Sequence, residues 1–68
     1  MKVRYDPEAD ALTIIFREEA AVESSDEARP GIIVDLDHTG EVVAIEVLDA
    51  SRRIADPSLV EFQLAHSG

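Results

Sequence analysis

The chain has 68 residues and no cysteine, and fifteen acidic side chains outnumber six basic ones, so the net charge is -9 at pH 7. This length predicts a single domain over residues 1–68. The missing cysteines exclude disulfide bonds, thiolate metal sites and a cysteine nucleophile. A surface this negative repels phosphate groups, so we expect neither nucleic acid nor an anionic membrane as a partner, whereas a basic protein would be attracted.

Two further properties of the sequence concern location and assembly. No apolar run approaches the roughly 20 residues of a membrane-spanning helix, and residues 1–6 lack the apolar core of a signal peptide. A cytoplasmic protein is therefore expected. A chain this short buries only about 60% of the surface that its unfolded form exposes. Small domains of this kind usually need a disulfide, a metal or a second subunit to be stable.

The N-terminal part of the chain predicts a β-hairpin. Residues 2–6 alternate, with Val3 and Tyr5 on one face and basic side chains on the other. Residues 6–10 place a proline among acidic residues and predict a turn. Residues 11–17 alternate again and give the second strand. The short connection makes this pair of strands antiparallel.

Residues 18–29 carry five acidic side chains and a single basic one, Arg29. Acidic residues this dense bury little apolar area, so the segment is expected to be a solvated loop. The alternative is a short edge strand anchored by Val22, whose charged neighbours would discourage aggregation. Pro30 and Gly31 then mark a break in the chain.

A second hairpin is predicted from residues 31–36 and 41–48, at the centre of the sheet. Between them, Asp-His-Thr-Gly suits a type I turn that ends with Gly40 in the left-handed region. This turn pairs Asp37 with Glu41 and makes both hairpin faces largely apolar, so both must be covered. One face is expected to carry Ile33, Val43, Ile45 and Val47. The opposite face is expected to carry Ile32, Val34, Leu36, Val42, Ala44 and Leu48.

A C-terminal helix is expected to cover one of these faces. Asp56 and Pro57 resemble an N-cap followed by the first helical position, and the helix continues over residues 58–65. The predicted fold class is therefore α+β: a small antiparallel sheet of about four strands, in two hairpins, with a short C-terminal α-helix. The other face is assigned to self-association with a second copy, because leaving it in water would forgo hydrophobic burial. Its residues are Ile33, Val43, Ile45 and Val47.

Residues 35–46 also nearly fit a calcium-binding loop, with acids at its first, third and twelfth places and glycine at its sixth. Such a loop requires flanking helices, and here strands rich in β-branched residues flank it on both sides. In the predicted hairpin Glu46 lies several residues from the turn, too far away to share an ion with Asp37. The hairpin interpretation is preferred, and no metal or other cofactor is expected.

Asp35, Glu46 and Asp49 remain as candidates for an acidic site. Glu46 stands in an apolar strand, where a half-buried carboxylate is costly unless it is paired. Such a group indicates either a functional site or, more often, a structural ion pair, here with Arg52 or Arg53. The serines have no histidine nearby in the sequence to act as a base. No catalytic residue is assigned, and the chain is not expected to be an enzyme.

Three blocks of the sequence carry a family resemblance. They are Tyr-Asp-Pro-Glu-Ala-Asp-Ala-Leu at residues 5–12, Pro-Gly-Ile-Ile-Val-Asp at 30–35, and Gly-Glu-Val-Val-Ala-Ile-Glu-Val-Leu-Asp-Ala-Ser at 40–51. In this order they resemble the bacterial and archaeal family known as domain of unknown function 2283, except that Ala44 replaces a usual glycine and Leu36 a frequent aromatic residue. The resemblance implies a small antiparallel sheet with a C-terminal helix and supplies no catalytic residues. Similar proteins are often encoded beside small toxin-like proteins, which implies an antitoxin-like role.

Two classes of function follow. The first is a non-catalytic protein-binding module, an acidic homodimer that engages a basic partner such as a toxin-type ribonuclease. The second is a small-ligand-binding or enzymatic module, with an acidic site at the dimer interface near Asp35, Glu46 and Asp49. The net charge and the missing nucleophile favour the first class. A pocket with convergent carboxylates would favour the second.

Overall fold

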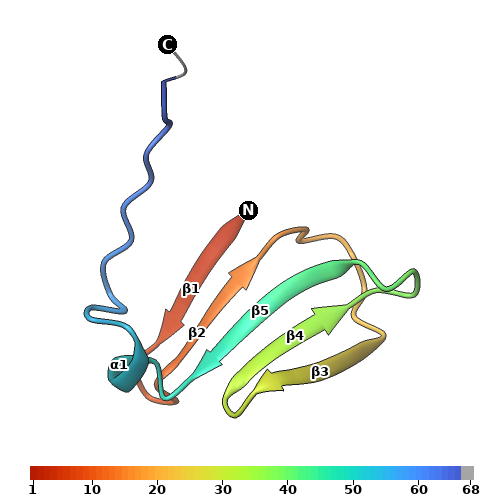
Figure 1. Cartoon of the computed structure of the whole chain (residues 1–68), viewed down its shortest axis with the longest axis horizontal. Helices are drawn as coiled ribbons and strands as arrows, with labels where there is room; N and C mark the ends of the chain where they lie inside the picture. Colours follow the sequence, from red (N-terminus) through yellow and green to blue (C-terminus); the bar gives the residue numbers. More distant parts are fainter. Residues whose placement is uncertain (67–68) are drawn as a thin grey trace.

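The fold is one antiparallel sheet of five strands followed by a single short helix (Figure 1). The computed structural model describes residues 1–66. The elements are β1 (Lys2–Asp6), β2 (Ala11–Ile15), β3 (Ser24–Arg29), β4 (Ile32–Leu36), β5 (Val42–Leu48) and α1 (Ala50–Arg53). The strand order is β1-β2-β5-β4-β3. The α+β class is confirmed, with five strands instead of four, and no described helix is long and apolar enough to cross a membrane.

The sheet contains both predicted hairpins, with β5 at its centre. β1 pairs with β2, and β4 pairs with β5, as the alternation of apolar residues predicts. The two hairpins join because β2 also pairs with β5 along its whole length. The prediction that the second hairpin forms the middle of the sheet is therefore confirmed.

The prediction of a solvated loop over residues 18–29 is wrong for β3. This strand pairs with β4, and every one of its residues is exposed. The backbone bond from the Glu23 amide to the Leu36 carbonyl, 2.8 Å long, extends this pairing. An edge strand without a buried face needs no apolar alternation, so its sequence gives no periodic signal.

The prediction of a helix over residues 58–65 is also wrong. Asp56 does cap a local turn, because its Oδ1 accepts hydrogen bonds from the Ser58 amide at 3.1 Å and the Ser58 hydroxyl at 2.6 Å. The chain then continues without helix, and Leu59, Phe62 and other apolar side chains of this stretch are exposed. A helix of so few residues is marginal unless it packs against something, and this segment does not pack on the sheet.

The helix that does form is α1, which lies against the β1–β2 turn. The Ala50 amide donates to the Asp10 backbone carbonyl at 2.9 Å, and the Ser51 hydroxyl donates to the Asp10 carboxylate at 2.7 Å. The Tyr5 hydroxyl donates to the same carboxylate at 2.7 Å. These hydrogen bonds, Ser51 foremost, lower the pKa of Asp10 below its usual value. Asp10 therefore joins the first hairpin to the end of the last strand.

A β-bulge between β4 and β5 changes the predicted register by one residue. The bulge lies between Asp35 and Leu36. On the N-terminal side of it along β4, Val34 pairs with Ile45 and Ile33 pairs with Glu46. The predicted hairpin instead pairs Ile33 with Ile45. Because successive side chains of a strand point to opposite faces, a shift of one residue exchanges the faces. Ile33 therefore lies on the face opposite to Ile45.

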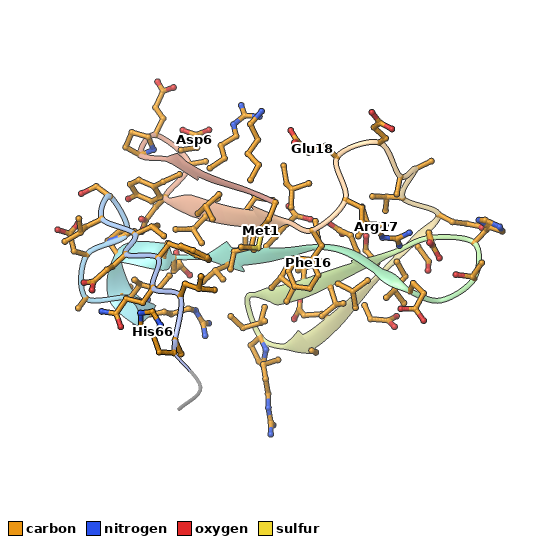
Figure 2. The ribbon with its side chains drawn as sticks, turned by 90° about the horizontal axis from the view of Figure 1, so that it is seen from above. Met1, Asp6, Phe16, Arg17, Glu18 and His66 are labelled. Atoms are coloured by element: carbon orange, nitrogen blue, oxygen red, sulfur yellow. The ribbon has the colours of Figure 1, made fainter. Side chains whose placement is uncertain are left out.

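The register divides the sheet into two faces of different character. Paired residues share a face, so one face, called the apolar face below, is lined by aliphatic and aromatic side chains. Its members are Val3, Tyr5, Leu12, Ile14, Ile32, Val34, Ile45 and Val47. The opposite face, called the mixed face, carries Arg4, Thr13, Ile15, Glu27, Ile33, Asp35, Ala44 and Glu46. Figure 2 shows Phe16 on one side of the sheet, and Asp6 and Glu18 on the other.

Neither face of the sheet is covered by another layer within residues 1–66. The buried apolar residues are Leu12, Val43, Ala44 and Ala50, and among the described residues no large side chain is fully buried. Most residues of the apolar face, including Ile45 and Val47, are only half-buried. The described part of one chain is therefore a single layer, whereas stable domains usually pack two layers around a core.

Gly40 closes the β4–β5 turn at φ 87°, which confirms the predicted left-handed conformation. A Cβ atom built on Gly40 would meet nothing within 4 Å, so only backbone strain opposes a side chain here. Gly40→Val should therefore destabilise the fold by roughly 1 kcal/mol or more, because β-branched residues are strained at positive φ. Gly40→Asn is the matched control, since asparagine tolerates this conformation. Equal midpoints of urea unfolding for the two variants would contradict the turn assignment.

Candidate functional site

Two of the three predicted acidic residues meet on the mixed face of the sheet. Asp35 lies on β4 opposite Ala44, and Glu46 lies on β5 opposite Ile33, so the two carboxylates occupy neighbouring rows. Asp35 is buried, with 7% of its surface exposed, and accepts a hydrogen bond of 2.6 Å from the Ser25 hydroxyl on β3. Three adjacent strands therefore contribute to one polar cluster, Ser25–Asp35–Glu46.

The two carboxylates of this cluster interact. A hydrogen bond to Asp35 raises the pKa of Glu46 above its usual value, and burial and the charge of Asp35 act in the same direction. Two ionised carboxylates in contact repel each other, which explains the contribution of the Asp35 charge to the raised pKa of Glu46. Interacting carboxylates of this kind occur both in structural networks and in catalytic sites.

A shallow hollow of 160 Å³ lies on the same face, over β1 and β2. It is lined by Arg4, Asp6, Ala11, Thr13 and Ile15. Thr13 pairs with Glu46, so the hollow borders the carboxylate pair without including either carboxylate in its lining. Pockets for small organic ligands usually measure about 300–1,000 Å³. In a single chain this hollow holds only a few waters or a fragment of a ligand.

The third predicted acid, Asp49, lies apart from the pair. It follows the end of β5 with φ 52° and begins α1, where its backbone carbonyl accepts a hydrogen bond from the Arg52 amide. The acidic site expected from Asp35, Glu46 and Asp49 is therefore reduced to Asp35 and Glu46. Ser25 joins them, and sequence reasoning missed it because β3 was expected to be a loop.

The residues predicted for self-association are divided by the bulge. Ile45 and Val47 lie half-buried on the apolar face, beside Ile32 and Val34 on β4. Ile33 lies on the mixed face opposite Glu46. Val43 is already buried in the chain, with 3% of its surface exposed. The predicted grouping of these residues on one face is therefore wrong, and the half-buried aliphatic side chains gather on the apolar face.

A second polar cluster holds the β4–β5 turn. The Asp37 carboxylate accepts hydrogen bonds from the Thr39 amide, the Thr39 hydroxyl and the Glu41 amide, at 2.8, 2.6 and 3.1 Å. It also forms an ion pair with Arg17, with Nη2 2.6 Å from Oδ2. The bonds from Thr39 and from Arg17 hold the pKa of Asp37 far below its usual range. The sequence predicts the turn but gives no signal for Arg17, which lies twenty residues earlier.

This geometry bears on the calcium-loop pattern of residues 35–46. Asp37 uses its oxygens for the turn, whereas Glu46 pairs with Asp35 on the mixed face. No group of three or more metal-binding side chains gathers within residues 1–66. We therefore expect no calcium binding at micromolar concentrations in a calorimetric titration at neutral pH. Micromolar affinity that is lost in Asp37→Ala would overturn the hairpin interpretation.

Comparison with protein families accounts for most of the chain. The sequence profile of a family described as protein of unknown function (DUF2283) matches residues 2–51. The chain belongs to the DUF2283 family. The DUF2283 match spans all five strands and the start of α1, so it includes Ser25, Asp35, Asp37 and Glu46. No curated protein and no solved structure matches the chain.

Proposed function

We propose that the chain is a non-catalytic protein-binding module that acts as a homodimer. The observation that carries this proposal is the open apolar face. The accessible surface is 5364 Å² for a chain of 7.4 kDa, whereas a compact folded protein of this mass exposes about 4,200 Å². The excess of roughly 1,200 Å² per chain, to which the apolar face and the exposed C-terminal tail both contribute, is larger than the roughly 800 Å² that each partner contributes to a standard interface.

A second copy packed on the apolar face would bury this surface in the way that two sheets form a sandwich. The inner faces of such sandwiches interdigitate to form one core about 10 Å thick. Each large aliphatic side chain that leaves water contributes about 1.5–3 kcal/mol. Symmetric packing suits the apolar face, because an isologous interface uses the same surface on both subunits.

The partner of this dimer is proposed to be a basic protein, and β3 is proposed as the place where it binds. β3 is an edge strand in which every residue is exposed; it carries Asp26 and Glu27, and Glu23 lies just before its first residue. An exposed edge strand offers unpaired backbone groups to an incoming strand, and its charges select the partner. An antitoxin-like role, with a basic ribonuclease as partner, is the most specific form of this proposal.

The homodimer is tested by sedimentation of the full chain at about 50 μM, well above the micromolar affinities of modest interfaces. We expect a dimer at this concentration and dissociation on dilution. A stable monomer at 50 μM would contradict the homodimer.

Binding at β3 is tested with a synthetic peptide in which lysine alternates with valine, and with a glutamate–valine peptide as the matched control. We expect only the basic peptide to bind, with an affinity that falls as salt rises, because exposed charges are screened. Charge reversal by Asp26→Lys with Glu27→Lys should weaken this binding at least tenfold. Equal binding to the reversed variant would overturn the assignment to β3.

A second function is favoured by one observation, the convergence of Asp35 and Glu46. In this alternative a second copy would pack on the mixed face instead and close it into a pocket for a small cationic or hydrogen-bonding ligand. Glu46→Gln discriminates the two proposals, because Glu46 lies away from the apolar face and pairs with β2 and β4, not with β3. The protein-binding module predicts unchanged binding of the basic peptide in Glu46→Gln.

A further inference from the structure

The C-terminal tail, residues 59–64, has the pattern of a β-strand that lacks a partner. Val60, Phe62 and Leu64 alternate with polar residues, and their exposed fractions are 57%, 78% and 81%. The Gln63 amide donates a hydrogen bond to the Glu61 carboxylate two residues earlier. Side chains two residues apart meet in this way when the backbone is extended. The tail is therefore an extended segment, with Val60, Phe62 and Leu64 on one side and Leu59, Glu61 and Gln63 on the other.

The edge strand β1 has the complementary pattern. It pairs only with β2, so one of its edges is free. Val3 and Tyr5 lie on the apolar face, and Lys2 and Arg4 lie on the mixed face. A strand added beside β1 with its apolar residues next to Val3 would place Glu61 beside the two basic side chains. Cross-strand pairs of apolar residues and of opposite charges both stabilise a sheet.

The other edge strand fits the tail poorly. β3 carries Ser24 and Asp26 on the apolar face, and Ser25 and Glu27 on the mixed face. A tail beside β3 would set Phe62 against polar side chains and Glu61 near Glu27, where like charges repel. Hydropathy and charge therefore both select β1.

The tail leaves the sheet on the side where a second copy would lie. Figure 1 shows it running from α1 away from the strands, and Figure 2 shows His66 on the same side of the sheet as Phe16. The last backbone hydrogen bond of the described tail joins the Leu59 amide to Asp56, so no backbone bond ties residues 60–66 to the sheet of their own chain. The tail also contributes part of the surface that exceeds that of a compact monomer.

We propose that residues 59–64 of each protomer add as a sixth strand to β1 of a second copy of the chain. The proposal rests on the homodimer proposed above and names the contact that completes it. The two tails cross between the protomers and are related by the two-fold axis, so the exchange closes and does not propagate into fibres. Each tail extends the partner's apolar face by three large side chains and pairs the free edge of β1.

The absence of cysteine makes the exchange directly testable by disulfide trapping. Val3→Cys is mixed with Val60→Cys, Phe62→Cys or Leu64→Cys in turn, and the matched control is Glu61→Cys, which faces the other way. Disulfides form only where the Cα atoms come within about 7 Å. We expect one of the three tail variants to give a covalent heterodimer under mild oxidation, at least tenfold faster than the control.

The chain with both Val3→Cys and the reactive tail cysteine decides which copy receives the tail. Exchange predicts a covalent dimer on a non-reducing gel. A covalently closed monomer, or no trapping in a protein that still sediments as a dimer, would overturn the exchange and leave the proposed homodimer standing. A protein that sediments as a monomer would overturn both.

A charge swap provides a second test. Arg4→Glu places like charges beside Glu61, so we expect the dimer to dissociate at least threefold more readily, and Glu61→Lys should restore the association of Arg4→Glu. Arg29→Glu, on the other edge strand, is the control of equal charge change. If Arg4→Glu and Arg29→Glu have the same effect and Glu61→Lys does not rescue, the tail does not lie beside β1.

Discussion

Asp37→Ala should lower the melting temperature of the protein by roughly 5 °C or more, which for a domain of this size corresponds to about 1 kcal/mol or more. Asp37 is buried, with 8% of its surface exposed, and its carboxylate accepts three hydrogen bonds from the turn and pairs with Arg17. Alanine would leave the Thr39 and Glu41 amides without this acceptor and would remove the ion-pair partner of Arg17. The turn that joins β4 to the central strand would lose its main restraint.

The same carboxylate predicts how stability depends on pH. Its pKa lies below the ordinary value, because hydrogen bonds from Thr39 and the Arg17 guanidinium favour the ionised form. The stabilisation by Asp37 is therefore fully present above pH 4, the ordinary pKa of aspartate, and is lost as pH falls through the lowered pKa. The difference in stability between the native chain and Asp37→Ala should be constant near neutrality and should shrink progressively in acid.

Thermal unfolding followed by circular dichroism at several pH values measures both effects. Asp26→Ala removes an exposed aspartate of β3 and serves as the control. Asp37→Asn separates hydrogen bonding from charge, because asparagine can still accept from an amide but cannot form the ion pair. Equal melting temperatures for Asp37→Ala and Asp26→Ala would show that the turn cluster does not hold the sheet.

Sequence reasoning predicts those parts of the fold in which side-chain periodicity and backbone structure agree. Strands β1, β2, β4 and β5 alternate or are rich in β-branched residues, and they form the predicted hairpins. β3 shows no such alternation, because its residues are held at the edge of the sheet by backbone hydrogen bonds and none of them is buried. The structure of β3 is determined by its pairing with β4, and the local sequence of β3 does not predict this pairing.

For the C-terminal tail, sequence reasoning predicts a helix where none forms. Asp56, Pro57 and Ser58 form a valid helix start, and the hydrogen bonds to the Asp56 carboxylate are present. However, Val60, Phe62 and Leu64 also follow the two-residue period of a strand. Capping alone stabilises only the first turn, and propagation of a short helix requires tertiary packing. The structure resolves this ambiguity in favour of the extended period.

The candidate site depends on a one-residue shift in the pairing of β4 with β5. In the predicted hairpin Asp35 and Glu46 point to opposite faces, because Glu46 pairs with Ile32. The bulge pairs Glu46 with Ile33 instead, so both carboxylates lie on the mixed face and interact there. A bulge adds one residue to one strand, and nothing in the alternation of β5 marks where it occurs. The same shift moves Ile33 away from the apolar face.

Ile45→Lys should have the largest effect on assembly. Ile45 lies on the central strand of the apolar face, between Ile14 on β2 and Val34 on β4, and it is only half-buried within one chain. In the proposed dimer it becomes part of the core between two sheets. A lysine there would set two charges against an apolar surface, one from each protomer, without a partner. The loss of apolar burial alone is about 1.5–3 kcal/mol per side chain.

The corresponding substitution on the other face separates assembly from folding. Thr13→Lys places the same charge on the mixed face. There the two cross-strand neighbours of residue 13 are Glu46 on β5 and Arg4 on β1. Since a tenfold change in affinity corresponds to about 1.4 kcal/mol, we expect Ile45→Lys to weaken the dimer by at least tenfold, whereas Thr13→Lys leaves it intact. Circular dichroism of both variants at the concentration used for sedimentation reports on folding. A folded Ile45→Lys that sediments as the native dimer, or a Thr13→Lys that dissociates instead, would move the interface away from the apolar face.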